Sequence, residues 1–366
     1  MAVTIVFVKE SASGERRASL SPETCKKLLG LKTRVVIERG AGVPASFVDE
    51  SYVGAEITGD RAAALSTADV LICVQPPPNS ELAVMKEGAL LIGLLAPHAD
   101  PVRVDTLVAE KITAFPLEKL PRTTRAQAMD VLSSQAGMAG YKAVLIAAQL
   151  APRFFPMLTT AAGTIRPSKV LIVGAGVAGL QAIATARRLG AQVEGFDVRP
   201  ETREQIESLG GKFLDLGVSA KGEGGYAREL TAEERAEQQR RLGEHLKNID
   251  VIVTTAAVPG RPAPKIISAA MVAGMKPGSV IVDLAAETGG NCESTRPGET
   301  IDVGGVTIAG PLNLASMGAL HASEMYARNV FNFLALMIDK EGALKLDWDD
   351  ELIAKTCLTH AGEKRA

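Results

Sequence analysis

The chain has 366 residues, more than twice the roughly 150 that one domain usually takes, so two domains are expected. Apolar residues make up 46% of the chain and aromatic residues only 4%, with 35 glycines, a composition that excludes a disordered chain and favours helices packed tightly on sheets. Forty basic against 42 acidic residues leave a net charge of -2, without the basic excess of a nucleic-acid-binding protein.

Cysteine usage, the start of the chain and apolar run lengths restrict its class further. The four cysteines are far apart and form no C-x-x-C pair, which argues against a zinc site and a disulfide framework, and no metal is expected: Cys25, Cys73, Cys292 and Cys357. The first residues hold no basic leader, so a cytoplasmic location is expected. The longest uncharged apolar stretch, Gly88–Pro97, is about half of what a membrane helix needs, so the chain is not expected to cross a bilayer by itself.

In the first 115 residues, short Val/Ile/Leu-rich runs alternate with helix-like segments. These runs are interpreted as buried strands at Val3–Val8, Thr33–Glu38, Asp69–Val74, Ala89–Leu95 and Ile112–Phe115. The clearest helix has Ser21 as N-cap and Pro22 in its first turn, and it ends at Gly30. Such alternation predicts a parallel sheet covered on both faces, the doubly wound class.

The rest of the chain repeats this pattern between two long helices. A proline-free segment, Arg125–Gln149, predicts a long helix that leaves the first domain. A second set of strands is expected at Lys169–Val173, Val193–Phe196, Val251–Thr254, Ser279–Leu284 and Val306–Ala309. A second long helix, Met317–Ile338, is expected to return to the first domain, followed by a short polar tail after Gly342.

A glycine-rich turn opens the second set of strands. The strand Lys169–Val173 runs directly into Gly-Ala-Gly-Val-Ala-Gly at 174–179, and an apolar helix follows. In this context Gly174 permits the sharp turn, Gly176 lets the backbone approach a pyrophosphate, and Gly179 lets the helix pack on the strand. The start of the helix at Val177 and Ala178 offers N–H groups to the anion. The sequence therefore predicts a dinucleotide site here.

An acid, Asp197, ends the next strand. A carboxylate there accepts hydrogen bonds from the adenosine ribose hydroxyls and repels a 2′-phosphate, which favours NAD(H) over NADP(H). Arg199 keeps the alternative open, because a nearby arginine can accommodate a 2′-phosphate. The other interpretation of Arg199 is a solvated residue at the start of a helix.

The fold class that these patterns predict is α/β, with two doubly wound Rossmann-like domains joined by long helices. Residues 1–135 together with 311–366 are expected to form the N-terminal Rossmann-like domain. Residues 136–310 are expected to form the NAD(H)-binding Rossmann domain, inserted between the two segments of the first.

The histidines offer few candidates for the general acid–base that most dehydrogenases need. His245 lies in a charged helix and is expected to be solvated, and His360 lies in the polar tail. His321 is expected to be packed or interfacial on the second long helix. Only His98, after the fourth strand, is a candidate for a catalytic role.

Polar side chains are concentrated at 120–135, the expected domain junction. On a helix, Gln127, Asp130 and Ser134 would form one polar stripe. The stripe is either an interdomain hydrogen-bond network or a set of groups that fix a nicotinamide ring and its ribose. A second segment, Lys221–Tyr226, holds three glycines and an aromatic residue, and is either a lid over a bound cofactor or an ordinary solvent loop.

Taken together, the chain closely resembles the NAD(H)-binding component, the first domain of the alpha subunit, of proton-translocating nicotinamide nucleotide transhydrogenase, over essentially its whole length. The residues that carry the resemblance are Lys9-Glu10 with Arg17 and Ser21-Pro22, the run at 125–135, Met157–Gly163, Gly174–Gly179, Asp197-Val198-Arg199, Gly224-Gly225-Tyr226, Thr254-Thr255-Ala256 and Gly289-Gly290-Asn291-Cys292.

The resemblance implies a set of cofactor contacts. Arg122, Gln127, Asp130 and Ser133 would surround the nicotinamide end of NAD(H), where they would act as the catalytic set. The remaining contacts would come from Gly174, Gly176, Val177, Ala178, Gly179, Asp197, Val198, Arg199, Gly225, Tyr226 and Ala257. Among these, Asp197 would hold the adenosine ribose and Tyr226 would belong to a mobile loop.

The resemblance also implies partners. NADH would pass a hydride directly to NADP+ held on a separate NADP-binding component, in a Si-face/Re-face transfer coupled to proton movement through a membrane-embedded component. The chain would form a homodimer and lie on the cytoplasmic face of the membrane through its partners. The Ala, Met and Leu residues of 310–320 make this segment a candidate for the symmetric contact. Such a transfer moves no proton in the chemical step, so it needs no general acid–base.

Alanine dehydrogenase, which shares this fold, is the alternative, and an NAD-binding protein without chemistry is a third class. Arg17 and the glycine turn resemble the alanine enzyme, but its substrate-binding lysine would fall in Cys73–Pro76, which has none. Its catalytic histidine aligns near Ala96, two residues before His98. The chain also departs from the transhydrogenase pattern after Asn313, where Leu-Ala-Ser-Met replaces a Pro followed by an Arg.

Overall fold

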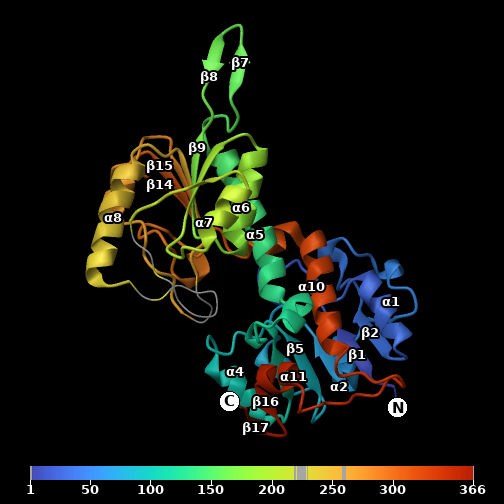
Figure 1. Ribbon diagram of the computed structural model, residues 1–366. Helices are drawn as coiled ribbons and strands as arrows, with labels where there is room; N and C mark the ends of the chain where they lie inside the picture. Colours follow the sequence, from blue (N-terminus) through green and yellow to red (C-terminus); the bar gives the residue numbers. More distant parts are fainter. Residues whose placement is uncertain (1, 218–219, 221–227, 229, 258–260, 366) are drawn as a thin grey trace. The chain divides into compact units, whose positions relative to one another are not determined.

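Figure 1 shows the computed structural model, which describes residues 2–217, 220, 228, 230–257 and 261–365. The chain forms two compact units. Unit 1 comprises Met1–Gln135 and Ala315–Ala366, and unit 2 comprises Ala136–Leu314. Each unit has its own central sheet and its own hydrophobic core.

The sheet of unit 1 has the order β17-β16-β6-β5-β4-β1-β2-β3. Its strands are β1 (Thr4–Phe7), β2 (Arg34–Glu38), β3 (Glu56–Thr58), β4 (Val70–Ile72), β5 (Leu90–Gly93), β6 (Thr113–Pro116), β16 (Thr359–His360) and β17 (Glu363–Lys364). Strands β1 to β6 are parallel, in the 3-2-1-4-5-6 order of a doubly wound sheet, and β16 is antiparallel to β6. All five expected strands are present. The short polar tail, for which no strand was predicted, adds two short strands to the sheet edge.

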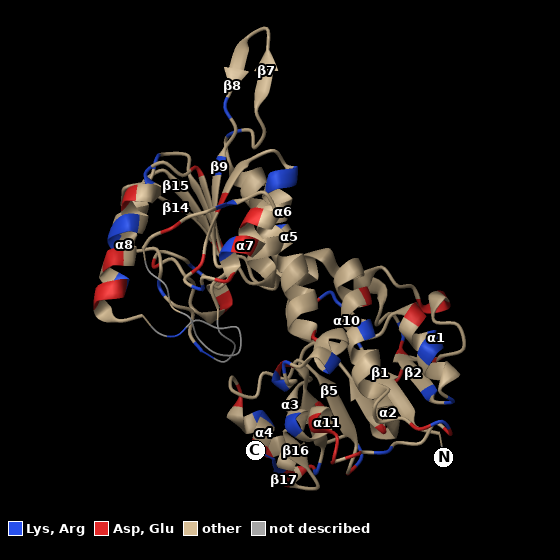
Figure 2. Ribbon diagram, in the orientation of Figure 1, with Lys and Arg blue, Asp and Glu red and all other residues tan. Residues whose placement is uncertain are grey.

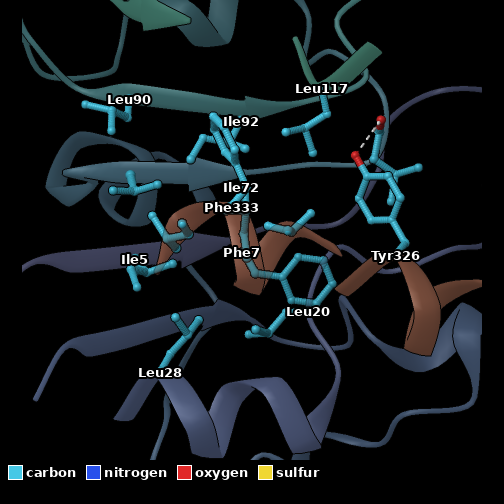
Figure 3. Packing of buried hydrophobic residues seen from close by; sticks show 14 of the residues in the cluster. Ile5, Phe7, Leu20, Leu28, Ile72, Leu90, Ile92, Leu117, Tyr326 and Phe333 are labelled. Atoms are coloured by element: carbon cyan, nitrogen blue, oxygen red, sulfur yellow. Dashed lines mark hydrogen bonds between the residues drawn. The ribbon is translucent and has the colours of Figure 1, made fainter. Parts of the chain in front are cut away.

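Both faces of this sheet are buried, because alternate residues of each strand enter different cores. Ile5 and Phe7 of β1 pack with Phe333 on one face, whereas Val6 packs with Leu71 on the other. Figure 3 shows the first of these cores, where side chains from β1, β4 and β5 meet those of α10. The helices of unit 1 are α1 (Pro22–Gly30), α2 (Arg61–Thr67), α3 (Asn79–Leu82), α4 (Pro101–Ala109), α10 (Ala319–Leu334) and α11 (Glu351–Thr356).

The expected helix over Arg125–Gln149 is in fact two elements. A 3₁₀ helix, η4 (Thr124–Met129), precedes α5 (Val131–Leu150), and Asp130 lies between them with ψ 92°. The carboxylate of Asp130 accepts hydrogen bonds from the backbone N–H and the hydroxyl of Ser133, as an N-cap residue does. The predicted polar stripe through Gln127, Asp130 and Ser134 was therefore wrong, because a capping residue interrupts the helix.

The sheet of unit 2 has the order β11-β10-β9-β12-β13-β15-β14, again doubly wound, with only β14 antiparallel among its described strands. Its strands are β9 (Lys169–Val173), β10 (Gln192–Phe196), β11 (Lys212–Phe213), β12 (Val251–Thr254), β13 (Val280–Asp283), β14 (Thr300–Val303) and β15 (Val306–Ala309). Its helices after α5 are α6 (Val177–Arg188), α7 (Thr202–Ser208), α8 (Ala232–Leu246) and α9 (Ala269–Ala273). The predicted fold class of two Rossmann-type units is confirmed.

A two-stranded hairpin of β7 (Leu158–Thr160) and β8 (Gly163–Ile165) forms a separate small sheet and projects from the body of unit 2 (Figure 1). Its strands and their flanks expose apolar side chains, with Met157 65% and Ile165 45% exposed. An isolated two-stranded sheet is only marginally stable in water. The hairpin was not predicted from the sequence.

One of the predictions for histidines was wrong. The His245 ring hydrogen-bonds the carboxylate of Glu194 on β10 and is not simply solvated, and this bond lowers the pKa of Glu194. His321 is exposed on α10. Figure 2 shows that acidic and basic residues are interspersed along α8, the helix that carries His245.

The four cysteines are unpaired, as the sequence indicated, and all four are buried. Burial raises the pKa of the thiols of Cys25 and Cys357 to about 11 and also raises those of Cys73 and Cys292. Among the described helices, none combines the length and the apolar character that a bilayer crossing requires.

Candidate functional site

The glycine turn between β9 and α6 is built by close contacts at two of its three glycines. Gly174 has a φ of +96°, and a Cβ atom there would lie 2.7 Å from Thr255 Oγ1. A Cβ on Gly179 would lie 1.8 Å from the carbonyl oxygen of Gly174. At Gly176, by contrast, a Cβ would meet no atom within 4 Å. The first and third glycines thus close the turn itself, whereas the second borders open space.

The start of α6 lies beside this open space. Gly176 is the N-cap, and Val177 and Ala178 open the first turn, where backbone N–H groups have no acceptor within the helix. Helix α5 packs against this turn through Gly140, at which a Cβ would lie 2.0 Å from the Ala178 carbonyl oxygen. The role of Gly140 was missed, although a glycine inside a helix is a signal of close packing.

Asp197, directly after β10, ties the end of that strand to the glycine turn. Its Oδ2 accepts a hydrogen bond from the Ala175 N–H at 2.7 Å and one from Arg199 Nη2 at 2.8 Å. Its Oδ1 accepts from the backbone N–H and from Nε of Arg199, both at 2.9 Å. Four donors therefore occupy the roughly four lone-pair positions of the carboxylate. Arg199 is not the solvated residue of one interpretation, because its guanidinium binds Asp197 in a bidentate pair.

The loop after β12 lines the other side of the turn. Thr255 Oγ1 donates a hydrogen bond to the carbonyl oxygen of Gly174 at 3.0 Å, and Ala257 is exposed two residues later. Val198 is half-buried, and its carbonyl oxygen accepts a hydrogen bond from the Ala220 N–H. The candidate cofactor residues of unit 2 that the structure describes thus gather at the carboxyl ends of β9, β10 and β12, where doubly wound sheets bind ligands.

We expect Gly176→Ala to weaken NADH binding by about tenfold while unit 2 folds normally, since a methyl group there meets only open space in the protein but blocks close approach of a pyrophosphate. Gly179→Ala should instead lower the midpoint of thermal unfolding, because its methyl group collides with the backbone. Calorimetric titration with NADH and thermal melts of both variants check this. Unchanged NADH affinity in a folded Gly176→Ala protein would contradict it.

In unit 1, the four nicotinamide-end candidates fall into two pairs. Arg122 and Gln127 have exposed side chains, on the loop before η4 and on η4 itself. Asp130 and Ser133 are half-buried and hydrogen-bond one another, with Ser133 Oγ donating to Asp130 Oδ2 at 2.5 Å. The structure therefore brings Asp130 and Ser133 together as a helix cap.

The segment that carries these residues is held in place by hydrogen bonds and an ion pair with other residues of unit 1. The guanidinium of Arg125 binds both carboxylate oxygens of Asp350, at 2.8 and 2.5 Å. The amides of Asn329 and Asn332 on α10 both donate to the Ala128 carbonyl oxygen at 2.9 Å. Exposed Gln127 thus lies on a backbone that is held at several points.

A buried polar cluster at the carboxyl edge of the unit 1 sheet was not predicted. Arg17 is 4% exposed, and its guanidinium donates hydrogen bonds to both carboxylate oxygens of Glu15 and to Gln135 Oε1, the last at 3.0 Å. The Gln75 amide donates to the same Glu15. The carboxylate of Glu10 accepts the backbone N–H groups of Val74 and Gln75. A charged Lys-Glu-x₆-Arg pattern after a buried strand was the available signal.

Burial raises the pKa of Glu10 to about 7, opposed by its backbone hydrogen bonds. A carboxyl pKa raised above its unfolded value stabilises the fold below the unfolded pKa, and this contribution is lost as the pH rises through about 7. We expect the free energy of unfolding to fall between pH 5 and pH 8 by on the order of 3 kcal/mol because of this group. Denaturant melts should show this fall reduced in Glu10→Gln and kept in a control, Glu50→Gln, which changes an exposed carboxyl of the same unit. Equal pH dependence in Glu10→Gln and wild type would count against the assignment.

The remaining sequence candidates include residues that the structure does not describe. Gly225 and Tyr226, with the expected lid, lie outside the described residues. His98 is exposed and follows Ala96, whose N–H donates to Glu118. Where the transhydrogenase pattern has an arginine, Met317 is 46% exposed.

Two family models match the chain. They are the alanine dehydrogenase/PNT N-terminal domain, over residues 6–139, and the alanine dehydrogenase/PNT C-terminal domain, over residues 143–366. This chain belongs to the alanine dehydrogenase/PNT family. Within this family, it is 46% identical over 370 residues to the first part of NAD(P) transhydrogenase subunit alpha of Rhodospirillum rubrum, covering 98% of this chain and 96% of that protein.

Two solved structures are also similar to this chain over nearly its whole length. The transhydrogenase from Sinorhizobium meliloti superposes with a TM-score of 0.90 at 44% identity, covering 99% of both chains. An L-alanine dehydrogenase superposes with a TM-score of 0.81 at 26% identity, covering 99% of this chain and 96% of that one. The resemblance to the transhydrogenase alpha subunit is confirmed, and alanine dehydrogenase is the more distant relative.

Proposed function

We propose that this chain is the NAD(H)-binding component of a proton-translocating NAD(P) transhydrogenase. The observation that carries the proposal is the glycine turn of unit 2, closed at Gly174 and Gly179 and open at Gly176, next to the first turn of α6 and to Asp197. These groups fit a dinucleotide: the N–H groups of α6 suit its pyrophosphate, and Asp197 suits a ribose without a 2′-phosphate once its carboxylate exchanges hydrogen bonds from Arg199 for those of the ribose hydroxyls.

The reaction class follows from what the nicotinamide-end residues can do. NADH supplies a hydride, which leaves as a hydrogen with its electron pair and makes NADPH from NADP+ on the partner component. The residues proposed at the nicotinamide end are Arg122, Gln127, Asp130 and Ser133. Their task is to orient the ring and exclude water so that the reacting carbons reach about 3–3.5 Å, since no proton is transferred.

The alternative, an alanine dehydrogenase, is supported by the buried Arg17 and by the more distant relatives. The cluster around Arg17 argues against it, because Gln75 contributes a neutral amide where the resemblance places a substrate-binding lysine. The exposed His98 is not joined to this cluster in the described part of unit 1.

Mixing the purified protein with an NADP-binding transhydrogenase component distinguishes the transhydrogenase function from the alanine dehydrogenase function. NADH-dependent reduction of NADP+ or an analogue is the expected result. Failure of that reaction, together with NADH oxidation by this chain alone in pyruvate and ammonia, would favour the alanine enzyme. Tight NADH binding with neither reaction would favour a binding protein without chemistry.

We further propose that the chain acts as a homodimer with an NADP-binding and a membrane-embedded proton-channel component, on the cytoplasmic face of the membrane. The name of the Rhodospirillum rubrum relative, which makes it only the first part of an alpha subunit, supports further components. The exposed apolar residues of the β7–β8 hairpin, with Leu312, Met317 and Leu320, support association with a second copy. Sedimentation of the chain alone should give twice the monomer mass, and a monomer at every concentration would refute the dimer.

A further inference from the structure

One buried amide, that of Asn291, binds the backbone of the loop after β12. Its Oδ1 accepts a hydrogen bond from the Ala256 N–H at 3.0 Å. Its Nδ2 donates to the carbonyl oxygens of Ala256 at 2.7 Å and Pro264 at 2.9 Å. Asn291 is 0% exposed, so both amide donors and the carbonyl are committed to backbone groups of one loop.

Asn291 is itself rigidly held. The main-chain carbonyl oxygen of Asn291 accepts hydrogen bonds from the N–H groups of Ile266 and Ile267, at 2.8 and 3.0 Å. The next residue, Cys292, donates its N–H to Asp283 Oδ2 at 3.0 Å, and Asp283 is 0% exposed at the end of β13. The side chain therefore connects the loop after β12 to the neighbouring strand.

The loop after β12 also contacts the glycine turn. Thr255 Oγ1 donates to the Gly174 carbonyl oxygen at 3.0 Å, and a Cβ on Gly174 would lie 3.0 Å from the Ala256 N. Ala256 thus lies next to both the turn and the Asn291 amide. Any movement of its peptide changes the position of the exposed Ala257 beside the turn.

We propose that Asn291 is a positioning residue for dinucleotide binding, setting the Ala256–Ala257 backbone against the glycine turn. This inference rests on the proposed function, since it assumes that NADH binds at the turn. An amide suits the task because it both accepts from and donates to the peptide groups of one residue, Ala256. An ionised carboxylate at 291 accepts but cannot donate, and would face two carbonyl oxygens.

The test compares NADH binding by wild type, Asn291→Asp and Asn291→Ala in the full chain, by calorimetric titration. We expect both variants to bind NADH about tenfold more weakly at pH 8. Lowering the pH should strengthen NADH binding by Asn291→Asp relative to wild type, because a protonated carboxyl regains one donor; Asn291→Ala should show no such recovery. With the NADP-binding component present, KM for NADH should rise while kcat at saturation is kept.

A matched control is Ser279→Ala, at the opposite end of β13. Ser279 is also 0% exposed, and its hydroxyl donates to the Ile249 carbonyl oxygen. The Ser279→Ala variant should lower the midpoint of thermal unfolding without changing NADH affinity. If Asn291→Asp binds NADH like wild type at every pH, or no more weakly than Ser279→Ala, the inference is wrong. If the wild-type protein binds no NADH, it is the proposed function that is wrong, and this outcome is distinct from a failure of the Asn291 inference.

Discussion

Gln127→Asn should slow hydride transfer to the partner's NADP+ by about a hundredfold while changing NADH affinity by less than about threefold. Gln127 is exposed on η4, whose backbone is anchored through Arg125 and through the asparagines of α10. Because that backbone is held, a side chain shorter by one methylene group withdraws its amide, and the backbone does not follow. A misplacement of about 1 Å at a reacting centre is enough for such a loss.

Single-turnover mixing of the NADH-loaded chain with the NADP-binding component measures the rate, and titration measures the affinity. Gln205→Asn, an exposed glutamine on α7 of unit 2, is the matched control and should leave both unchanged. A normal transfer rate in Gln127→Asn would make Gln127 a surface residue without a role. A parallel loss of rate and NADH affinity would assign it to binding alone.

Asp197→Ala should weaken NADH binding by roughly 10- to 100-fold and narrow or reverse the preference for NADH over NADPH. The substitution removes the acceptor for the Ala175 N–H in the glycine turn. It also leaves the Arg199 guanidinium without the carboxylate that now binds it in two places. A 2′-phosphate would then meet a cation where it now meets an anion.

Titrations with NADH and NADPH measure the preference, and two further variants separate the causes. The double variant Asp197→Ala with Arg199→Ala should lose the gain in relative NADPH affinity and should still bind NADH weakly. Asp215→Ala breaks a comparable Asp–Arg pair, that of Asp215 and Arg203, which is exposed, and should change neither affinity. An unaltered ratio of NADH to NADPH affinity in Asp197→Ala would remove Asp197 from cofactor selection.

The elements of the fold that the sequence predicted are those determined by local patterns. Runs such as Lys169–Val173 and Val251–Thr254 match β9 and β12 residue for residue, because buried parallel strands need continuous apolar runs. Ser21 and Pro22 located the start of α1 for an equally local reason. The two-residue strands β16 and β17 were missed because β16 joins the sheet by pairing with the distant strand β6, and β17 in turn pairs with β16.

For the candidate site, the sequence predicted residue types better than contacts. It identified Asp197 and Arg199 but not that each is the other's partner, since a pair two residues apart depends on the local turn. Asn291 stood in a noticed Gly-Gly-Asn-Cys motif without a role, because its partners Ala256 and Pro264 are contacted only through backbone atoms. Backbone acceptors leave no residue-type signature in a sequence.

The burial of all four thiols has a practical consequence. A thiol reacts as its thiolate, and burial both shields these sulfur atoms and raises their pKa, to about 11 for Cys25 and Cys357. A cysteine introduced at an exposed position, such as Thr160 on β7, would therefore be modified in preference to the natural ones. A fluorescent or spin label can thus be attached at one chosen sulfur atom without first substituting the four natural cysteines.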